Sequence, residues 1–148
     1  MKRILFAVIL LSTVFNCNPT FAKKGKVLLE KGDHYYKLFM FEKSAKYYKK
    51  YYAKNTNDFY VTNRLADMYR VRGNYTDAAE WYSKAVTLEG ATPETQYHYA
   101  YCLRNIANYT EALTQFQKYA EQNSSDTRGA KIAAGLADIN QFYKDSSR

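Results

Sequence analysis

The sequence contains few residues that could carry out catalysis. Its 148 residues include two histidines and two cysteines, and no set of histidine, cysteine and carboxylate residues shows the spacing of metal ligands. A glycine-rich phosphate loop and a Gly-x-Ser-x-Gly nucleophile turn are both absent. Two cysteines are too few for a disulfide scaffold or a four-cysteine zinc site. The sequence therefore predicts a protein that is not an enzyme and uses no cofactor and no metal.

The composition instead favours binding through tyrosine and basic side chains. The chain has 16 tyrosines, and its 22 lysine and arginine residues exceed 14 acidic residues to give a net charge of +8. The excess is local: residues 23–58 hold ten basic and four acidic residues, whereas residues 59–148 hold ten of each. Such a region suits anionic lipid, an acidic partner or cell-wall polysaccharide. We expect no nucleic-acid partner, because the N-terminus predicts export from the cytoplasm.

The first 22 residues have the layout of a secretory signal peptide. Lys2 and Arg3 precede an apolar run at residues 4–15, and Ala22 offers a small residue for cleavage. That run of 12 residues is shorter than the roughly 20 that a membrane-spanning helix needs. We therefore predict an exported protein, located in the periplasm or at the periplasmic face of the outer membrane.

Cys17 leaves a second interpretation of this segment open. A lipoprotein signal places an acylated cysteine directly after the apolar run, and residues 14–17 resemble that arrangement except at Asn16, where a small residue is usual. Lipidation of Cys17 is the alternative to its removal with the signal peptide. In the case of removal Cys102 remains as the single thiol, and its helical apolar surroundings predict a small buried residue.

A fixed period of about 34 residues organises the rest of the chain. Residues 65–85 and 99–119 align without a gap, and the segment one period earlier keeps the same pattern of large and small side chains. Across the three copies, two columns are small and two are aromatic. Their members are Gly32, Ala66 and Ala100; Ser44, Ala78 and Ala112; Phe41, Tyr75 and Tyr109; and Tyr48, Tyr82 and Phe116. Columns that stay in phase in this way indicate a repeat protein.

Each copy predicts two helices joined by a short turn, because apolar residues recur twice at three- and four-residue spacing. Asn74 and Asn108 are the expected N-caps of the second helices, and Glu111 can complete a capping box. Thr92 followed by Pro93 predicts the start of the third copy. Residues 127–148 continue in phase, either as a capping helix or as the first helix of a partial fourth repeat.

This pattern resembles the tetratricopeptide repeat, a helix-turn-helix unit of about 34 residues. Copy two carries the family positions Leu65, Ala66, Tyr69, Gly73, Tyr75, Ala78, Tyr82 and Ala85. Copy one is the weakest match, with Lys31 at an apolar position, and Tyr51 and Tyr119 stand where a small residue is usual. The resemblance implies an all-α, right-handed solenoid. Its three repeats would lie at about residues 25–58, 59–92 and 93–126, followed by a C-terminal capping helix.

The resemblance also implies where a partner would bind, because in this family the first helix of each pair lines a concave groove. The corresponding residues are Leu29, Asp33, Tyr36, Lys37, Tyr60, Asn63, Asp67, Arg70, Tyr97, Tyr101 and Arg104, with Arg128 and Lys131 extending the row. Tyrosine beside arginine suits an extended peptide, since the ring offers rigid contact area and the guanidinium a fork for carboxylates. Leu29 and Asp33 occupy two positions of the Lys/Asn clamp with which some family members hold a C-terminal carboxylate, so that clamp is not reproduced.

The leading hypothesis is a non-catalytic adaptor of the bacterial cell envelope that binds a protein or peptide partner in this groove. A signal peptide followed by tyrosine- and lysine-rich repeats also looks like the opening segment of larger outer-membrane proteins with an OmpA-like domain, some of them linked to type IX secretion. One alternative is therefore that the chain is a fragment of such a protein. Another is an envelope tether whose basic, aromatic residues 39–52 contact lipid or cell wall, rather than facing water as an ordinary repeat helix.

Overall fold

The computed structural model describes residues 19–146, which form seven α-helices and no β-strand. The helices are α1 (Pro19–Lys37), α2 (Phe41–Tyr52), α3 (Phe59–Val71), α4 (Tyr75–Ala85), α5 (Pro93–Asn105), α6 (Tyr109–Gln122) and α7 (Thr127–Ser146). The predicted all-α class is thereby confirmed. Residues 1–18 of the predicted signal peptide, Cys17 included, lie outside the described residues.

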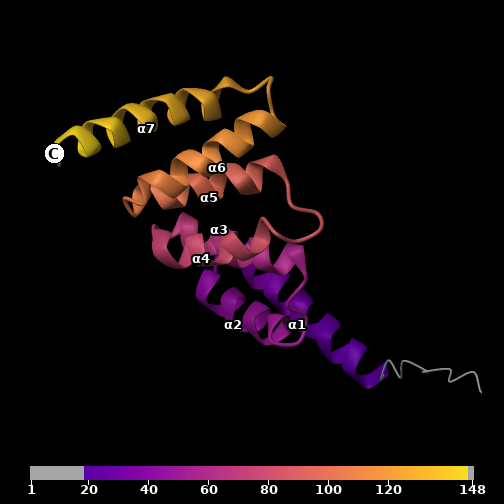
Figure 1. The fold of residues 1–148 in the computed structure, drawn as a ribbon. Coiled ribbons are helices and arrows are strands. Elements are labelled where there is room, and N and C mark those ends of the chain that lie inside the picture. The colour runs from indigo at the N-terminus through magenta and orange to yellow at the C-terminus, as the bar shows by residue number, and fades with distance from the viewer. Residues whose placement is uncertain (1–18, 147–148) are drawn as a thin grey trace, which may run out of the picture.

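The helices stack in chain order, from α1 and α2 at one end to α7 at the other (Figure 1). The extensive contacts join helices that follow one another in the sequence, and α7 covers α6. Such nearest-neighbour packing defines a solenoid, in which each pair buries its apolar side on the next. The first turns of α1 extend past the end of α2 (Figure 1).

One kind of turn joins the two helices of every pair. Its left-handed residue is Phe39, Gly73 or Ala107, with φ of 56°, 76° and 61°. The residue that follows donates its backbone N–H to a carbonyl five positions earlier, at 2.9–3.0 Å. Glycine adopts this conformation without steric penalty, whereas a side chain at the same position is strained. The structure therefore keeps the turn even where the sequence offers a poor residue for it.

Side chains cap the helices at the positions that the sequence predicted. Asn74 and Asn108 each accept a hydrogen bond from the backbone N–H three residues further on. Thr92 does the same at the start of α5, whose first residue is proline. The capping box expected at Glu111 is wrong, because its carboxylate accepts from the side chain of Gln115 one turn further along α6.

Small residues let the helices of a pair approach closely, and an aromatic ring fills the space between them. In copy one, Gly32, Ser44 and Tyr48 are all buried. A Cβ on Gly32 would lie 2.4 Å from two ring carbons of Tyr48, so the ring leaves room only for glycine. The Ser44 hydroxyl donates to the Gly32 carbonyl at 2.8 Å, which satisfies the one polar group at this contact.

Candidate functional site

The first helices of the pairs, together with α7, present polar and aromatic side chains to one another along one side of the stack. We call this surface the odd-helix face. Contacts between neighbouring repeats, together with contacts along single helices, define it. Its residues are Asp33, Tyr36, Tyr60, Asn63, Arg64, Asp67, Arg70, Glu94, Tyr97, His98, Tyr101, Arg104 and Arg128.

Asp33 is held between two repeats. Its Oδ1 accepts from the Tyr48 hydroxyl at 2.6 Å and from the Tyr60 hydroxyl of α3 at 2.7 Å. Burial, reinforced by the bond to Asp33, raises the pKa of Tyr48 far above its usual value, so the phenol remains a neutral donor. The carboxylate predicted to face a partner is thus already engaged by two phenols of its own chain.

Arg64 lies above two tyrosine rings at the same junction. Its guanidinium carbon is 4.3 Å from the ring centroid of Tyr36 on α1 and 5.1 Å from that of Tyr60 on α3. A guanidinium over an aromatic face is attracted by the ring quadrupole. Arg64 therefore joins the first two repeats, although it was not among the residues predicted from the sequence.

Asp67 repeats the arrangement of Asp33 one copy later. Its Oδ1 accepts from the Tyr82 hydroxyl at 2.5 Å and lies 3.4 Å from Arg70 Nη2, while its Oδ2 accepts from Asn63 at 3.2 Å. Arg70 Nε also donates to the Tyr82 hydroxyl at 3.0 Å. Burial, followed by the negative charge of Asp67, raises the pKa of Tyr82 well above its usual range. In copy three the two positions are Tyr101 and Phe116, so no carboxylate–phenol pair forms there.

His98 lies between two carboxylates. Its Nδ1 is 3.9 Å from Asp67 Oδ1 and its Nε2 is 3.3 Å from Glu94 Oε1. Burial first, and the nearby Arg70 second, hold the pKa of His98 below its usual value of 6.5. The imidazole is therefore neutral near neutral pH. The two acids favour its protonation, but burial and Arg70 oppose protonation more strongly. Neither His98 nor Glu94 was among the site residues predicted from the sequence.

The far end of the odd-helix face pairs arginine with tyrosine twice more. The guanidinium of Arg128 on α7 is 5.0 Å from the ring centroid of Tyr97, and its Nη2 is 3.7 Å from Glu94. Arg104 is 5.0 Å from the ring centroid of Tyr101, which also meets Tyr75 edge to face. Guanidinium groups over tyrosine rings thus recur on α3, α5 and α7.

The remaining predicted residues lie apart from these clusters. Leu29 packs against the apolar core around Tyr48, so it contributes to packing. Lys37 is exposed at the end of α1, and Lys131 is exposed on α7. Cys102 is fully buried, as predicted, and burial raises the pKa of its thiol to about 12, which leaves it unreactive at neutral pH.

Within residues 19–146, no three histidine, cysteine or acidic residues come together in a way that could hold a metal ion. Over the same described part of the chain, none of the helices combines the length and apolarity that crossing a bilayer requires.

The stacked helix pairs, their common left-handed turn and the alternation of small and aromatic columns define a tetratricopeptide-type repeat protein. Residues 25–119, more than half of the chain, match the family model described as "Anaphase-promoting complex, cyclosome, subunit 3" (ANAPC3), and the chain belongs to this family. The family's name assigns no partner to this chain.

One sequence relative and two solved structures are similar to this chain. The chain is 29% identical over 117 residues to signal recognition particle subunit SRP72 of Dictyostelium discoideum, covering 79% of this chain but only 16% of that protein. The MamA protein superimposes with a TM-score of 0.72 at 19% identity, over 80% of this chain and 64% of that one. The first TPR of Spaghetti (RPAP3), bound to the HSP90 peptide SRMEEVD, gives a TM-score of 0.66 at 16% identity, over 80% of this chain and 94% of that one.

Proposed function

We propose that this chain is a non-catalytic adaptor that binds an extended segment of a partner protein along the odd-helix face. The observation that carries the proposal is the row of guanidinium groups stacked on tyrosine rings, formed by Arg64, Arg104 and Arg128. The ring holds each guanidinium at this face, where N–H groups that are not bonded within the chain can donate to a carboxylate or a carbonyl of a peptide. Arg128 already donates to Asp126 at 2.8 Å, so Arg64 and Arg104 carry most of this role.

The carboxylates of the face already have partners within the chain, so we expect the cations and rings to recognise the partner protein. Asp33 and Asp67 are occupied by buried phenols, and Glu94 lies beside His98 and Arg128. A partner segment with acidic side chains therefore fits the face better than a basic one. The similarity to the peptide-bound first TPR of Spaghetti supports this use of the fold, although it concerns the fold alone.

A capture experiment tests the adaptor function. The double variant Arg64→Gln and Arg104→Gln removes two stacked cations, and it should recover less partner from a cell-envelope extract than the unmodified chain. The double variant Lys46→Gln and Lys118→Gln removes the same charge from exposed positions on the even-numbered helices α2 and α6. Equal recovery by the two double variants would exclude the odd-helix face as the binding surface.

We further propose that the adaptor works in the bacterial cell envelope, a location that rests on the sequence of residues 1–22. Mass spectrometry of the protein isolated from its own cells tests this. An N-terminus at Lys23 would support removal of a signal peptide, and a lipid-modified N-terminal Cys17 would support the lipoprotein alternative. An intact Met1 in the cytoplasmic fraction would contradict export.

A further inference from the structure

The turn between α1 and α2 carries three consecutive apolar side chains that face solvent. Leu38, Phe39 and Met40 are 53%, 80% and 39% exposed. Single exposed apolar residues are ordinary on protein surfaces, but a run of three at the tip of a turn forms an apolar projection. We call residues 38–40 the apolar tip. The prediction that Phe39 belongs to a lysine-rich helix is wrong, because the structure places it in the turn before α2.

Phe39 holds a conformation that its side chain disfavours. Its φ of 56° lies in the left-handed region, which bulky residues rarely adopt. Gly73 makes the same turn in copy two without that strain. The fold therefore does not require phenylalanine here. The ring meets that of Phe41 edge to face, with centroids 6.0 Å apart, and most of its surface remains in solvent.

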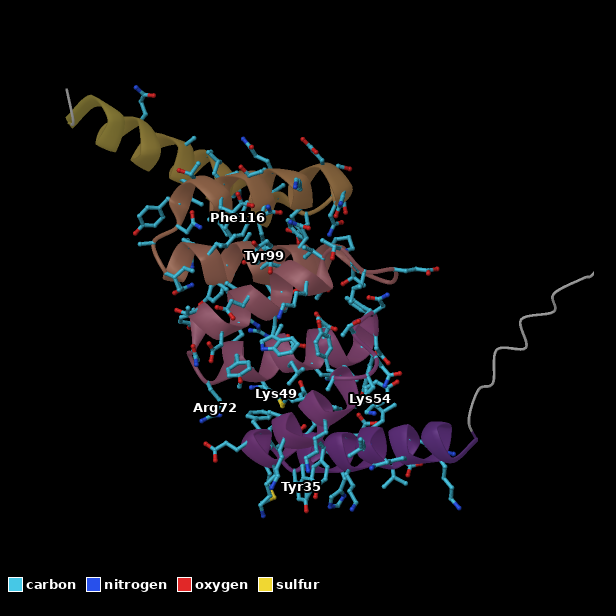
Figure 2. The ribbon with its side chains drawn as sticks, turned by 60° about the horizontal axis from the view of Figure 1, so that its bottom comes forward. Tyr35, Lys49, Lys54, Arg72, Tyr99 and Phe116 are labelled. Atoms are coloured by element: carbon cyan, nitrogen blue, oxygen red, sulfur yellow. The ribbon has the colours of Figure 1, made fainter. Side chains whose placement is uncertain are left out.

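Basic side chains lie next to the apolar tip. A hollow of about 330 Å³ beside it is lined by Phe39, Met40 and Phe41 together with Lys43 and Arg72. The one acid in this lining, Glu42, accepts from Arg72 at 2.9 Å. Arg72 lies at the edge of the molecule (Figure 2). Lys37, directly before the tip, is also exposed. The tip thus combines exposed apolar area with a positive rim.

We propose that the apolar tip inserts into the interfacial layer of an anionic lipid bilayer, with Lys37 and Lys43 at the level of the lipid phosphates. Lysine suits this rim because its long apolar stem can lie along the acyl boundary while its ammonium group reaches the headgroups. The basic excess of residues 23–58 adds attraction to an anionic surface. A bilayer also fits the shape of the apolar tip. Fluid acyl chains can surround three exposed apolar side chains on a turn, whereas a protein partner would need a surface of complementary shape. None of the three residues of the apolar tip belongs to the odd-helix face.

Sedimentation of the full chain with vesicles tests the proposal, with phosphatidylglycerol vesicles compared against phosphatidylcholine vesicles. Phe39→Gly removes the ring and relieves the strained turn, so the variant stays folded. We expect its partition into phosphatidylglycerol vesicles to fall by at least about tenfold, as expected for the loss of one inserted aromatic side chain. Ala107→Gly relieves the equivalent turn in copy three and controls for the backbone change, with no change in partition expected. Unchanged partition of Phe39→Gly would overturn the proposal.

A local probe separates the apolar tip from any lipid contact by residues 1–18. Trp81 is the single tryptophan. In the variant Phe39→Trp with Trp81→Phe, anionic vesicles should shift the emission to shorter wavelength, and bromine atoms on the acyl chains should quench it. The variant Ala107→Trp with Trp81→Phe should show neither effect. An unquenched tryptophan at position 39 would overturn the proposal even if the chain sediments with vesicles. Loss of a captured protein partner in Phe39→Gly, without a change in lipid binding, would assign the tip to a protein instead.

Discussion

The phenol of Tyr119 donates a hydrogen bond to Asp126 Oδ2 at 2.5 Å, across the junction between α6 and α7. Tyr51 and Asp58 form the same pair two repeats earlier, at 2.9 Å. In both cases the other carboxylate oxygen accepts a backbone N–H in the first turn of the helix that follows. Each tyrosine occupies a position where the tetratricopeptide unit usually has a small residue. The large ring is therefore used to reach the next repeat and hold its N-cap.

Removing the Tyr119 hydroxyl should loosen α7. In Tyr119→Phe the carboxylate of Asp126 loses one of its donors and holds the start of the helix less firmly. We expect faster amide hydrogen exchange in the first turns of α7, measured by mass spectrometry, with little change in α3. Tyr51→Phe is the reciprocal variant and should act on α3 and not on α7. Identical exchange patterns in the two variants would contradict this role of the phenols.

Gly32 should not tolerate a methyl group. In Gly32→Ala the new Cβ meets the buried ring of Tyr48 at 2.4 Å, and such overpacking lowers the free energy of unfolding by about 1–3 kcal/mol. Gly135 on α7 is the matched control, because a Cβ there meets nothing within 4 Å. Gly135→Ala should raise helix stability by roughly 0.5–1 kcal/mol. Urea unfolding measures both, and a stable Gly32→Ala would show that Tyr48 can move aside.

The phenol of Tyr82 should stabilise the second repeat. Tyr82→Phe leaves the half-buried Asp67 without its shortest donor, and the free energy of unfolding should fall by about 1.5–3 kcal/mol, as is usual for a bond to a charged group. Tyr60→Phe removes a phenol from Asp33 in the same way, but Tyr60 is 43% exposed and water can replace it. We therefore expect a smaller loss for Tyr60→Phe. Equal losses would mean that burial does not set the strength of these bonds.

Protonation of His98 should destabilise the fold. Its pKa is held below 6.5 in the folded chain, so below that pH the unfolded chain binds a proton that the folded chain resists. Stability should fall as the pH drops from neutral through about 6.5. His98→Gln should remove this part of the loss, whereas His34→Gln, at an exposed position, controls for replacing a histidine. Parallel pH profiles for the original chain and His98→Gln would refute the prediction.

The repeat architecture could be predicted because its core contacts join the same columns inside every copy. Gly32, Ser44 and Tyr48 meet inside one copy, and the equivalent residues of the next two copies are likewise buried. A side-chain size that recurs once in every repeat therefore indicates an equivalent buried position in each of the three copies. The caps at Asn74 and Asn108 could be predicted for a related reason. A capping side chain accepts a hydrogen bond from the first turn of the helix that directly follows it.

The odd-helix face was harder to predict because its contacts join different columns of neighbouring repeats. Asp33 meets Tyr60 from the next repeat, and His98 in turn reaches back to Asp67. His98 and Arg64 occupy the same column but differ in residue type. A search for residue types that recur in every repeat therefore finds neither of them. One signal was available: Asp33 and Asp67 are each followed at the same spacing by a tyrosine, whereas copy three lacks both the acid and the phenol. Residues that change together in this way indicate a contact.

The dependence of each helix on its immediate neighbours has a consequence for ligand binding. A free chain held together only by successive links can come apart from either end while the middle remains intact. A peptide that touched both Arg64 on α3 and Arg128 on α7 would bridge units that otherwise lack extensive contact with each other. Binding would then do more than raise the melting temperature: it would merge the stepwise loss of single helices into one cooperative transition.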